Sequence, residues 1–131
     1  MSFDTRSKII TLAQAASLAE GSSSQGSPVA AIVTHLDVLQ AGHVHKFAQF
    51  AAAHPGQLFL ILTDPGSPLA PLEARAEMAA ALRVVDYVVP APEGAAPVLA
   101  AIRPAVTLDD EGDDRERTRQ LIEHVRNRSR I

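Results

Sequence analysis

Two kinds of apolar segment alternate along the chain. Residues 29–33 and residues 57–63 are apolar at nearly every position, with the length and the β-branched content of buried strands. Because these runs lack an alternation of apolar and polar residues, we expect a sheet that is covered on both faces. Between them, residues 42–53 carry apolar side chains at helical spacing, and His54-Pro55-Gly56 ends that helix. The pattern predicts an α/β fold.

The remaining elements continue this alternation. Helices are predicted over residues 5–19, 72–82, 95–102 and 115–128, and further strands over residues 87–89 and 105–108. Gly21 is expected to end the first helix, and the Ser- and Gly-rich residues 21–28 predict a loop. Strands that alternate with helices imply right-handed crossovers. We therefore expect a doubly wound parallel sheet in three layers, as in Rossmann-like folds.

A chain of 131 residues is expected to form a single domain. Residues 1–27 would supply the first helix and a loop, residues 28–108 the core, and residues 109–131 an acidic loop and a charged helix. Apolar residues make up 47% of the sequence and are mostly small, which suits close packing of helices on a sheet.

The composition excludes several classes of function. The chain has no cysteine, so a disulfide, a thiolate metal site and a cysteine nucleophile are all impossible. The net charge is −3 and the only lysines are Lys8 and Lys46, whereas a general nucleic-acid surface requires clustered positive charge. No apolar run reaches the roughly 18 residues that a membrane span requires. We therefore expect a cytoplasmic protein that binds neither nucleic acid nor membranes.

The junction between the first strand and the helix after it is the most informative part of the sequence. Gly42 and His43 are predicted in the first turn of that helix, where unpaired backbone N–H groups and the helix dipole favour an anion. A phosphate site is one interpretation of such a corner. A glycine near a helix start also occurs for purely steric reasons, so the geometry alone leaves both interpretations open.

Residues 34–43, with the sequence THLDVLQAGH, resemble the signature of the cytidylyltransferase-like nucleotidyltransferases, in which Gly-x-Phe-Asp leads into His-x-Gly-His. The sequence resembles the nucleotidyltransferase domain of bacterial ADP-heptose synthases more than it resembles glycerol-3-phosphate cytidylyltransferase. Residues 71–75 and 80–90 are similar to the second helix of the family and the strand after it, and residues 103–106 match in order. The resemblance spans roughly residues 12–108.

This resemblance implies a HUP-type (adenine-nucleotide α-hydrolase-like) fold and transfer of CMP or AMP, from CTP or ATP with Mg²⁺, to a sugar or polyol phosphate. Pyrophosphate is released by in-line attack, and imidazoles, cationic side chains and a helix N-terminus hold the phosphates without a covalent nucleophile. His43 and Gln40 match the catalytic positions of the motif. The matching nucleotide-binding positions are Thr34, His35, Asp37, Gly42, His45, Lys46, Thr63, Asp64, Arg75 and Arg83.

The sequence departs from the family pattern where positive charge is needed. Gln40 replaces the first histidine of the motif and cannot become a cation at any pH. Thr34 stands where the family has a glycine that lets the nucleotide approach the backbone. The loop 64–71 contains no lysine or arginine. The acidic residues 109–113 replace a Lys-Gly-Gly-Asp segment and would repel a triphosphate unless Mg²⁺ bridges them.

Three functional hypotheses follow. The leading one is a cytidylyltransferase-like domain whose catalytic power is impaired or lost and which retains at most nucleotide or phosphate binding. The second is an active nucleotidyltransferase with rearranged donors. The third is a non-catalytic interaction module that forms a homodimer through Phe47, Phe50 or the final helix.

A transition-metal site is not expected, although four potential ligands, His35, Asp37, His43 and His45, lie close in sequence. His43 and His45 are two residues apart on a helix, so their side chains point about 200° from one another and do not converge on one ion. The acidic residues 109–114 are expected to stabilise the start of the final helix, whose arginines would lie on a solvated face. An oligomer contact or a regulatory tail is the alternative interpretation of this run.

Overall fold

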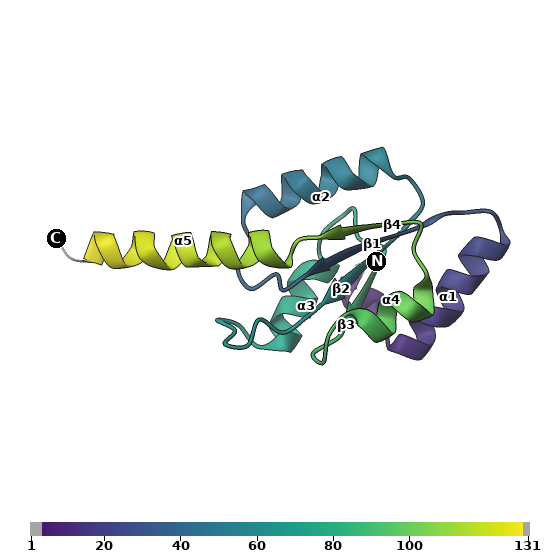
Figure 1. The fold of residues 1–131 in the computed structure, drawn as a ribbon, viewed down its shortest axis with the longest axis horizontal. Helices are drawn as coiled ribbons and strands as arrows, with labels where there is room; N and C mark the ends of the chain where they lie inside the picture. The colour runs from purple at the N-terminus through teal and green to yellow at the C-terminus, as the bar shows by residue number, and fades with distance from the viewer. Residues whose placement is uncertain (1–3, 130–131) are drawn as a thin grey trace.

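A sheet of four parallel strands forms the centre of the structure, a computed structural model that describes residues 4–129 (Figure 1). The strands are β1 (Val29–Thr34), β2 (Gln57–Leu62), β3 (Tyr87–Pro90) and β4 (Val106–Asp109). The helices are the 3-10 helix η1 (Thr5–Lys8), α1 (Leu12–Ser24), α2 (Ala41–Ala53), α3 (Leu72–Ala80), α4 (Ala96–Ile102) and α5 (Glu111–Ser129). Within the described residues, no helix is long and apolar enough to cross a membrane.

The strand order is β3-β2-β1-β4, and every neighbouring pair is parallel. In β1, Ala31 pairs with Phe59 of β2 on one side and with Thr107 of β4 on the other. The chain therefore moves outward from β1 to β3 and then returns to add β4 beyond β1. This order confirms the predicted doubly wound α/β fold. In such sheets ligands bind outside the carboxyl ends of the strands, where the order changes direction, which here lies between β1 and β4.

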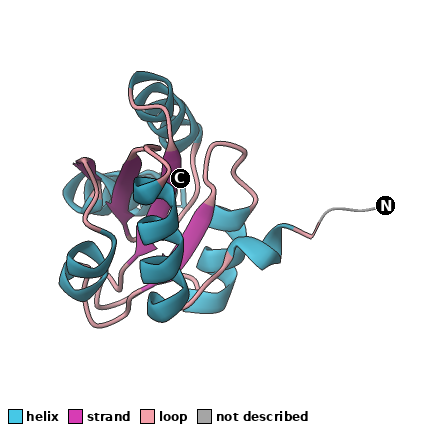
Figure 2. Cartoon of the chain, turned by 90° about the vertical axis from the view of Figure 1, so that its right-hand side faces the viewer, coloured by secondary structure: helices cyan, strands magenta, loops and turns pink. Residues whose placement is uncertain are grey.

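The two faces of β1 belong to two separate apolar cores. Val29, Ala31 and Val33 pack in the core that includes residues of α1 and α4. Ala30 and Ile32 pack in the core that includes residues of α2 and α3. Figure 2 shows helices on both sides of the sheet. All of β1 is buried, as its continuous apolar sequence predicts, because a strand covered on both faces has no solvent side.

The first long helix begins later than the predicted residue 5. α1 starts at Leu12 because Thr11 and Gln14 form a capping box, in which Gln14 N donates to Thr11 Oγ1 and Thr11 N donates to Gln14 Oε1. Ahead of it, Ile9 forms an isolated parallel bridge with Val88 and so covers part of the outer edge of β3.

The same helix also ends later than predicted. α1 continues through Gly21 to Ser24, so the first half of the predicted loop 21–28 is helical. Gly26, with a φ of 77°, adopts the left-handed conformation that was expected of Gly21. A glycine that ends a helix typically has a positive φ. The sequence has glycines at both 21 and 26, and it does not reveal which of them adopts that φ.

The final helix begins at Glu111 rather than at residue 115, so the acidic run lies mostly in its first turn. Asp109 Oδ1 accepts a hydrogen bond from Glu111 N at 3.1 Å, and carboxylates in a first turn are stabilised by the helix dipole. Beyond this turn α5 projects from the body of the molecule, with the C-terminus at its far end (Figure 1). The other predicted boundaries differ from the observed ones by two residues or fewer.

Gly56→Ala tests the close contact between the turns that precede β1 and β2. Gly56 has a φ of 140°, and a Cβ atom there would lie 2.3 Å from Pro28 O. We expect this variant to lose about 3 kcal/mol of its free energy of unfolding in urea titrations. Gly66→Ala is the matched control, because Gly66 has a φ of 97° but no atom within 4 Å of its Cβ position, and we expect a loss of about 1 kcal/mol. Equal losses would contradict the contact.

Candidate functional site

The carboxyl ends of β1 and β4 meet the start of α2 at one corner. Thr34 ends β1, and Asp110 follows the last residue of β4. Gln40 is the N-cap of α2, and Gly42 and His43 lie in its first turn. The structure therefore brings the sequence motif to the edge of the parallel sheet at which ligands bind in this class of fold.

The first turn of α5 fills this corner with carboxylates of the protein itself. Asp110 is buried, with an exposed fraction of 0%. Thr34 Oγ1 donates to Asp110 Oδ2 at 3.0 Å, and Lys46 Nζ donates to Asp110 Oδ1 at 2.6 Å. Arg117 donates to the same Oδ1 from 3.3 Å. A buried carboxylate is tolerated only when hydrogen bonds and opposite charges surround it, and Asp110 has both.

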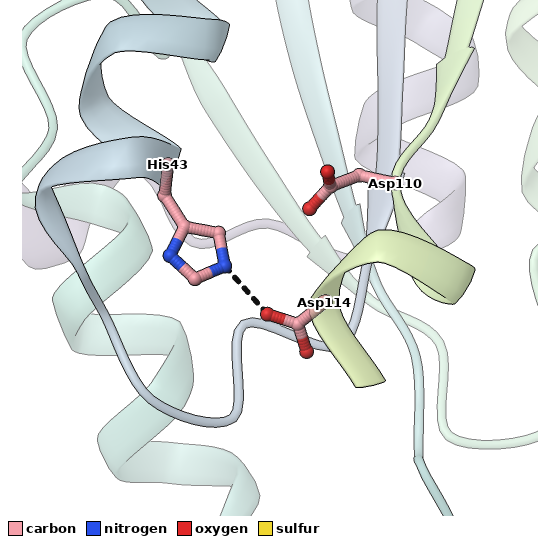
Figure 3. Close-up of side chains that lie close together, drawn as sticks. All are labelled: His43, Asp110 and Asp114. Atoms are coloured by element: carbon pink, nitrogen blue, oxygen red, sulfur yellow. Dashed lines mark hydrogen bonds and ion pairs between the residues drawn. The ribbon is translucent and has the colours of Figure 1, made fainter. Parts of the chain in front are cut away.

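His43 is paired with a second carboxylate, that of Asp114 (Figure 3). His43 Nε2 lies 2.6 Å from Asp114 Oδ1, and the two side chains are 0% and 1% exposed. Asp37 N donates to the other oxygen, Asp114 Oδ2, at 3.4 Å. The corner is therefore packed with side chains of the protein, and the imidazole of His43 contacts a carboxylate there.

The backbone determines which nitrogen of His43 carries the ring proton. Gln40 N donates to His43 Nδ1 at 3.0 Å, so Nδ1 must be the unprotonated nitrogen. The proton then lies on Nε2, which donates it to Asp114. Both ring nitrogens are used within the protein. Gln40, which was expected at a catalytic position, supplies no positive charge here. Its side-chain Nε2 is buried without a hydrogen-bond partner in residues 4–129.

The same three side chains form a group that sequence spacing did not indicate as a metal site. His43, Asp110 and Asp114 each offer a ligand atom, and these atoms lie within 4.8 Å of one another. Their hydrogen bonds disfavour a cation, because a metal on Nε2 would require a proton on Nδ1, to which Gln40 N already donates. Lys46 already supplies positive charge to Asp110. The absence of a transition-metal site stays a prediction.

Lys46 was expected to bind nucleotide and is held by two acids instead. Burial alone would lower the pKa of Lys46, but its hydrogen bonds to Asp110 and Asp113 outweigh burial and raise the pKa above the ordinary value. The same hydrogen bond lowers the pKa of Asp113. Lys46 and Asp113 therefore remain oppositely charged at neutral pH, and the ammonium group of Lys46 is already paired.

Gly42 and His45 lie on the part of α2 that is exposed to solvent. A Cβ atom at Gly42 would lie 3.6 Å from Arg117 Nε, so an arginine of α5 lies against the N-terminus of α2. His45 is exposed whereas His43 is buried, which agrees with the expectation that the two imidazoles do not converge. The place at which a phosphate would approach Gly42 is bordered by a side chain that already contacts Asp110.

His35, Thr63 and Glu111 form a second polar group, at the carboxyl end of β2. Thr63 Oγ1 donates to Glu111 Oε2 at 2.7 Å and lies 2.9 Å from His35 Nδ1. His35 and Thr63 are buried, so neither is presented to a ligand as the motif implied. In the described part of the chain His35 Nε2 has no hydrogen-bond partner, and nothing in the structure explains this. The first turn of α5 thus caps β2 as well as β1.

Arg75 joins two loops rather than presenting an open guanidinium group. It is 1% exposed. Arg75 NH1 donates to His35 O at 2.8 Å and to Thr63 O at 2.9 Å, and Arg75 Nε donates to Ala70 O at 3.1 Å. These carbonyl groups belong to the segments that follow β1 and β2. Arg75 therefore stabilises the edge of the sheet, and its role as a phosphate ligand stays a prediction.

Asp37 and Asp64 organise the loop that follows β2. Asp37 Oδ1 accepts hydrogen bonds from Leu69 N at 2.8 Å and Ala70 N at 3.3 Å. Asp64 Oδ1 accepts one from Gly66 N at 2.8 Å, which forms an Asx turn. Two residues expected to bind nucleotide thus have structural roles, in a loop that contains no cationic residue.

Arg83 lies at the opposite end of the sheet. It is exposed and borders a groove with Lys8, Gln57 and Asp86, at the amino ends of β2 and β3. Because all strands are parallel, this end is remote from the first turn of α2. Arg83 therefore lies away from the corner at which Thr34, Gln40 and His43 come together, and its role in binding stays a prediction.

Asp110, Asp114 and Arg117 lie in the corner but are not among the site residues predicted from the sequence. Asp110 and Asp114 are four residues apart at the start of a helix, a spacing that places two carboxylates on one helix face. That signal was present in the sequence. It does not reveal whether the face turns toward solvent or toward the sheet, because the partners lie far away along the chain.

A small cavity remains between the loop after β2 and α5. Its volume is about 220 Å³. The lining residues are Asp37, Pro65, Ser67, Asp114, Arg115, Thr118, Arg119 and Ile122. Ligand pockets typically have volumes of about 300–1,000 Å³, so this cavity is smaller than most of them.

Comparisons with known proteins support the fold. The structure is similar to the crystal structure of the lipopolysaccharide core biosynthesis protein from Thermoplasma volcanium GSS1, with a TM-score of 0.57 and 18% sequence identity, over 63% of this chain and 73% of that chain. No protein-family model matches the sequence, and no curated protein matches it. At this level of identity the likeness shows that the two proteins share the arrangement of an α/β Rossmann-like fold.

Proposed function

We propose that this chain is a catalytically silent protein of nucleotidyltransferase-like fold, in which its own carboxylates occupy the place of substrate phosphates. The observation that carries the proposal is the buried contact of 2.6 Å between His43 Nε2 and Asp114 Oδ1, beside the buried Asp110. The resemblance of residues 34–43 to the transferase signature supports the family part of the proposal. The fold shared with a lipopolysaccharide core biosynthesis protein is consistent with it.

Donors of the kind that bind phosphate converge on these two carboxylates. His43 Nε2 donates to Asp114, and Lys46 and Arg117 donate to Asp110. Carboxylate and phosphate oxygens accept the same charge-assisted hydrogen bonds, at similar distances. The first turn of α5 therefore acts as an internal anion, which satisfies the donors that a triphosphate would need.

A triphosphate that entered beside this turn would meet unfavourable electrostatics. Two unit charges of the same sign at 4 Å repel by about 4 kcal/mol at an effective dielectric constant of 20. Lys46 and Arg117, which would offset that repulsion, are already paired with Asp110. Gln40 adds no positive charge. The corner thus lacks the cationic donors that stabilise charge during phosphoryl transfer.

An active nucleotidyltransferase that uses CTP or ATP with Mg²⁺ is the alternative. It requires the first turn of α5 to leave the corner when nucleotide binds, so that His43 and Lys46 become available. That movement would also break the hydrogen bond of 2.8 Å from Asp110 N to Val33 O, which extends the pairing of β4 with β1. The loop 64–71 supplies no cation to compensate. We therefore favour the silent form.

A protein of this fold that catalyses no reaction would act through the partners that it binds. We therefore propose that this chain is an interaction module. Of the two aromatic residues considered for a homodimer interface, Phe47 is 0% exposed and lies in the core between α2 and α3, so it cannot form one. Phe50 is half-buried beside His54, with their rings 4.9 Å apart. The final helix remains the candidate interaction surface. A cytoplasmic location stays a prediction.

Titration of the purified protein tests the silent form. We expect that the protein binds neither CTP nor ATP in the presence of Mg²⁺ by calorimetry and releases no pyrophosphate with sugar or polyol phosphates. Gln40→His should not create turnover, because His43 stays paired with Asp114 and the loop cations remain absent. An active cytidylyltransferase in the same assay is the positive control. Tight binding together with pyrophosphate release by the unmodified protein would overturn the proposal.

Removal of the internal anion should open a site for an external one. In Asp110→Ala/Asp114→Ala, the donors of His43, Lys46 and Arg117 lose their acceptors, so we expect a destabilisation of about 3–5 kcal/mol. Inorganic phosphate or pyrophosphate should then raise the melting temperature at constant ionic strength, with a gain in stability of about 2.7 kcal/mol at 100 times the Kd.

Two further variants make this result interpretable. Glu116→Ala/Glu123→Ala removes the same number of acids from the exposed side of α5 and should not respond to phosphate. Asp114→Ala alone leaves Asp110 in place and provides a folded sample if the double variant does not fold. An equal response to phosphate in the unmodified protein and in all variants would contradict the internal anion.

A further inference from the structure

A groove lies at the amino ends of β2 and β3, at the end of the sheet opposite the corner. Its volume is about 490 Å³, within the range of about 300–1,000 Å³ that is typical of ligand sites. The lining side chains come from η1, from the start of β2, from the turn after α3 and from the start of β3, and they include Lys8, Gln57, Arg83, Val85, Asp86 and Tyr87. The corner contributes none of them, so the groove is a separate site.

Hydrogen bonds hold the walls of the groove in place. Leu82 O accepts from Val85 N at 3.2 Å and from Lys8 Nζ at 3.2 Å, which joins η1 to the turn after α3. Asp86 and Leu58 form two hydrogen bonds. Asp86 N donates to Leu58 O at 3.0 Å, and Leu58 N donates to Asp86 Oδ2 at 2.7 Å. The groove is therefore formed before any ligand arrives, which lowers the cost of ordering it on binding.

Three charged groups of the groove have hydrogen-bonding capacity that the protein leaves unused. The guanidinium group of Arg83 has no acceptor within residues 4–129. Lys8 Nζ donates to a neutral carbonyl oxygen, so two of its three protons and its charge remain available. Asp86 Oδ1 has no partner in the described part of the chain, because Leu58 N donates to Oδ2. The groove thus presents two positive charges and one negative charge.

We propose that this groove binds a free acidic α-amino acid, glutamate or aspartate. The ligand carries two carboxylates and one α-ammonium group. The carboxylates match Lys8 and Arg83, and the ammonium group matches Asp86. Each charge of the ligand then meets an opposite charge, which offsets the cost of removing it from water. The inference goes beyond the proposed function and does not rest on it, because the internal anion takes no part.

The carboxylate of Asp86 selects against ligands that carry only negative charge. A phosphate ion or a simple dicarboxylate has no cation for Asp86 and would be repelled by it. The guanidinium group of Arg83 has the planar fork of donors that binds a carboxylate through two hydrogen bonds. A residue inside a peptide has lost its α-ammonium group, its α-carboxylate or both, so the match is to the free amino acid.

Tyr87 and Val85 provide the apolar part of the groove. Val85 is buried, and the ring of Tyr87 lies against that of Phe59, with ring centroids 5.1 Å apart. These fixed side chains offer a surface to the methylene groups of the ligand. Gln57 is half-buried at the start of β2 and brings an amide that can both donate and accept.

Nuclear magnetic resonance titration of the isotope-labelled full chain tests the inference. Sodium glutamate and sodium aspartate are compared with sodium chloride at equal ionic strength. We expect saturable shifts of the backbone amides of Lys8, Arg83 and Asp86, with a Kd below about 1 mM. The amides of Gly42 and His43 should not shift, because the corner lies at the other end of the sheet.

A series of ligands tests each charge separately on the unmodified chain. Glutamine lacks the side-chain carboxylate, and glutarate lacks the ammonium group. Each should bind at least about 10-fold more weakly than glutamate, because a charge-assisted hydrogen bond is lost. Inorganic phosphate should not shift the amides of the groove.

Variants test the two ends of the groove. Arg83→Gln should weaken glutamate binding at least about 10-fold. Asp86→Asn keeps an oxygen that accepts from Leu58 N, so the fold should be retained. It should weaken the binding of glutamate but not that of glutarate, since only glutamate has an ammonium group for Asp86. Arg126→Gln is the matched control, because it removes the same charge from the exposed end of α5 and should bind as the unmodified chain does.

Several results would overturn the inference. These are the absence of saturable shifts with both amino acids, shifts that lie outside the groove, and equal affinities for glutamate and glutarate. Unchanged glutamate binding by Arg83→Gln would do the same. The titrations of the unmodified chain decide the matter even if a variant fails to fold.

Discussion

The seating of the first turn of α5 on the carboxyl ends of the sheet is the constraint on which the rest of the structure depends. Through Asp110 it contacts Thr34 and Lys46, and through Asp114 it contacts His43, while Glu111 reaches Thr63. These contacts connect β1, β2 and α2 to a helix that otherwise leaves the domain. Buried carboxylates are tolerated there because each one is surrounded by donors.

The same contacts determine what the corner can do chemically. A parallel α/β sheet gathers helix N-termini and strand ends at one edge, which makes that edge a general binding place for anions. In this protein the anion is part of the chain. On the proposed function, His43, Lys46 and Arg117 donate to this internal anion before any ligand arrives, and the cavity beside it, of about 220 Å³, is smaller than common ligand pockets. The fold shared with a lipopolysaccharide core biosynthesis protein shows the architecture alone, because activity depends on the residues of the site and not on the fold.

Closing the corner also changes the role of α5. The first turns of the helix have buried partners in the domain, whereas residues 123–128 are exposed to solvent. The two halves differ because carboxylates near a helix N-terminus are stabilised by the dipole and by the donors of the corner, whereas residues 123–128 are exposed.

The sequence by itself determined the elements whose signals are local. Continuous apolar runs identified β1 and β2, because a strand buried on both faces has no polar side, and the motif predicted that Gly42 and His43 begin a helix at the ligand edge of the sheet. The local signal for the end of α1 was ambiguous, because either Gly21 or Gly26 could end the helix. The observed positive φ of Gly26 shows that the helix continues through Gly21. The tertiary structure alone decided that Asp110 and Asp114 turn inward. A run of acids has the same sequence whether water or protein donors surround it, and here the donors on Lys46 and His43 lie 64 and 71 positions away along the chain.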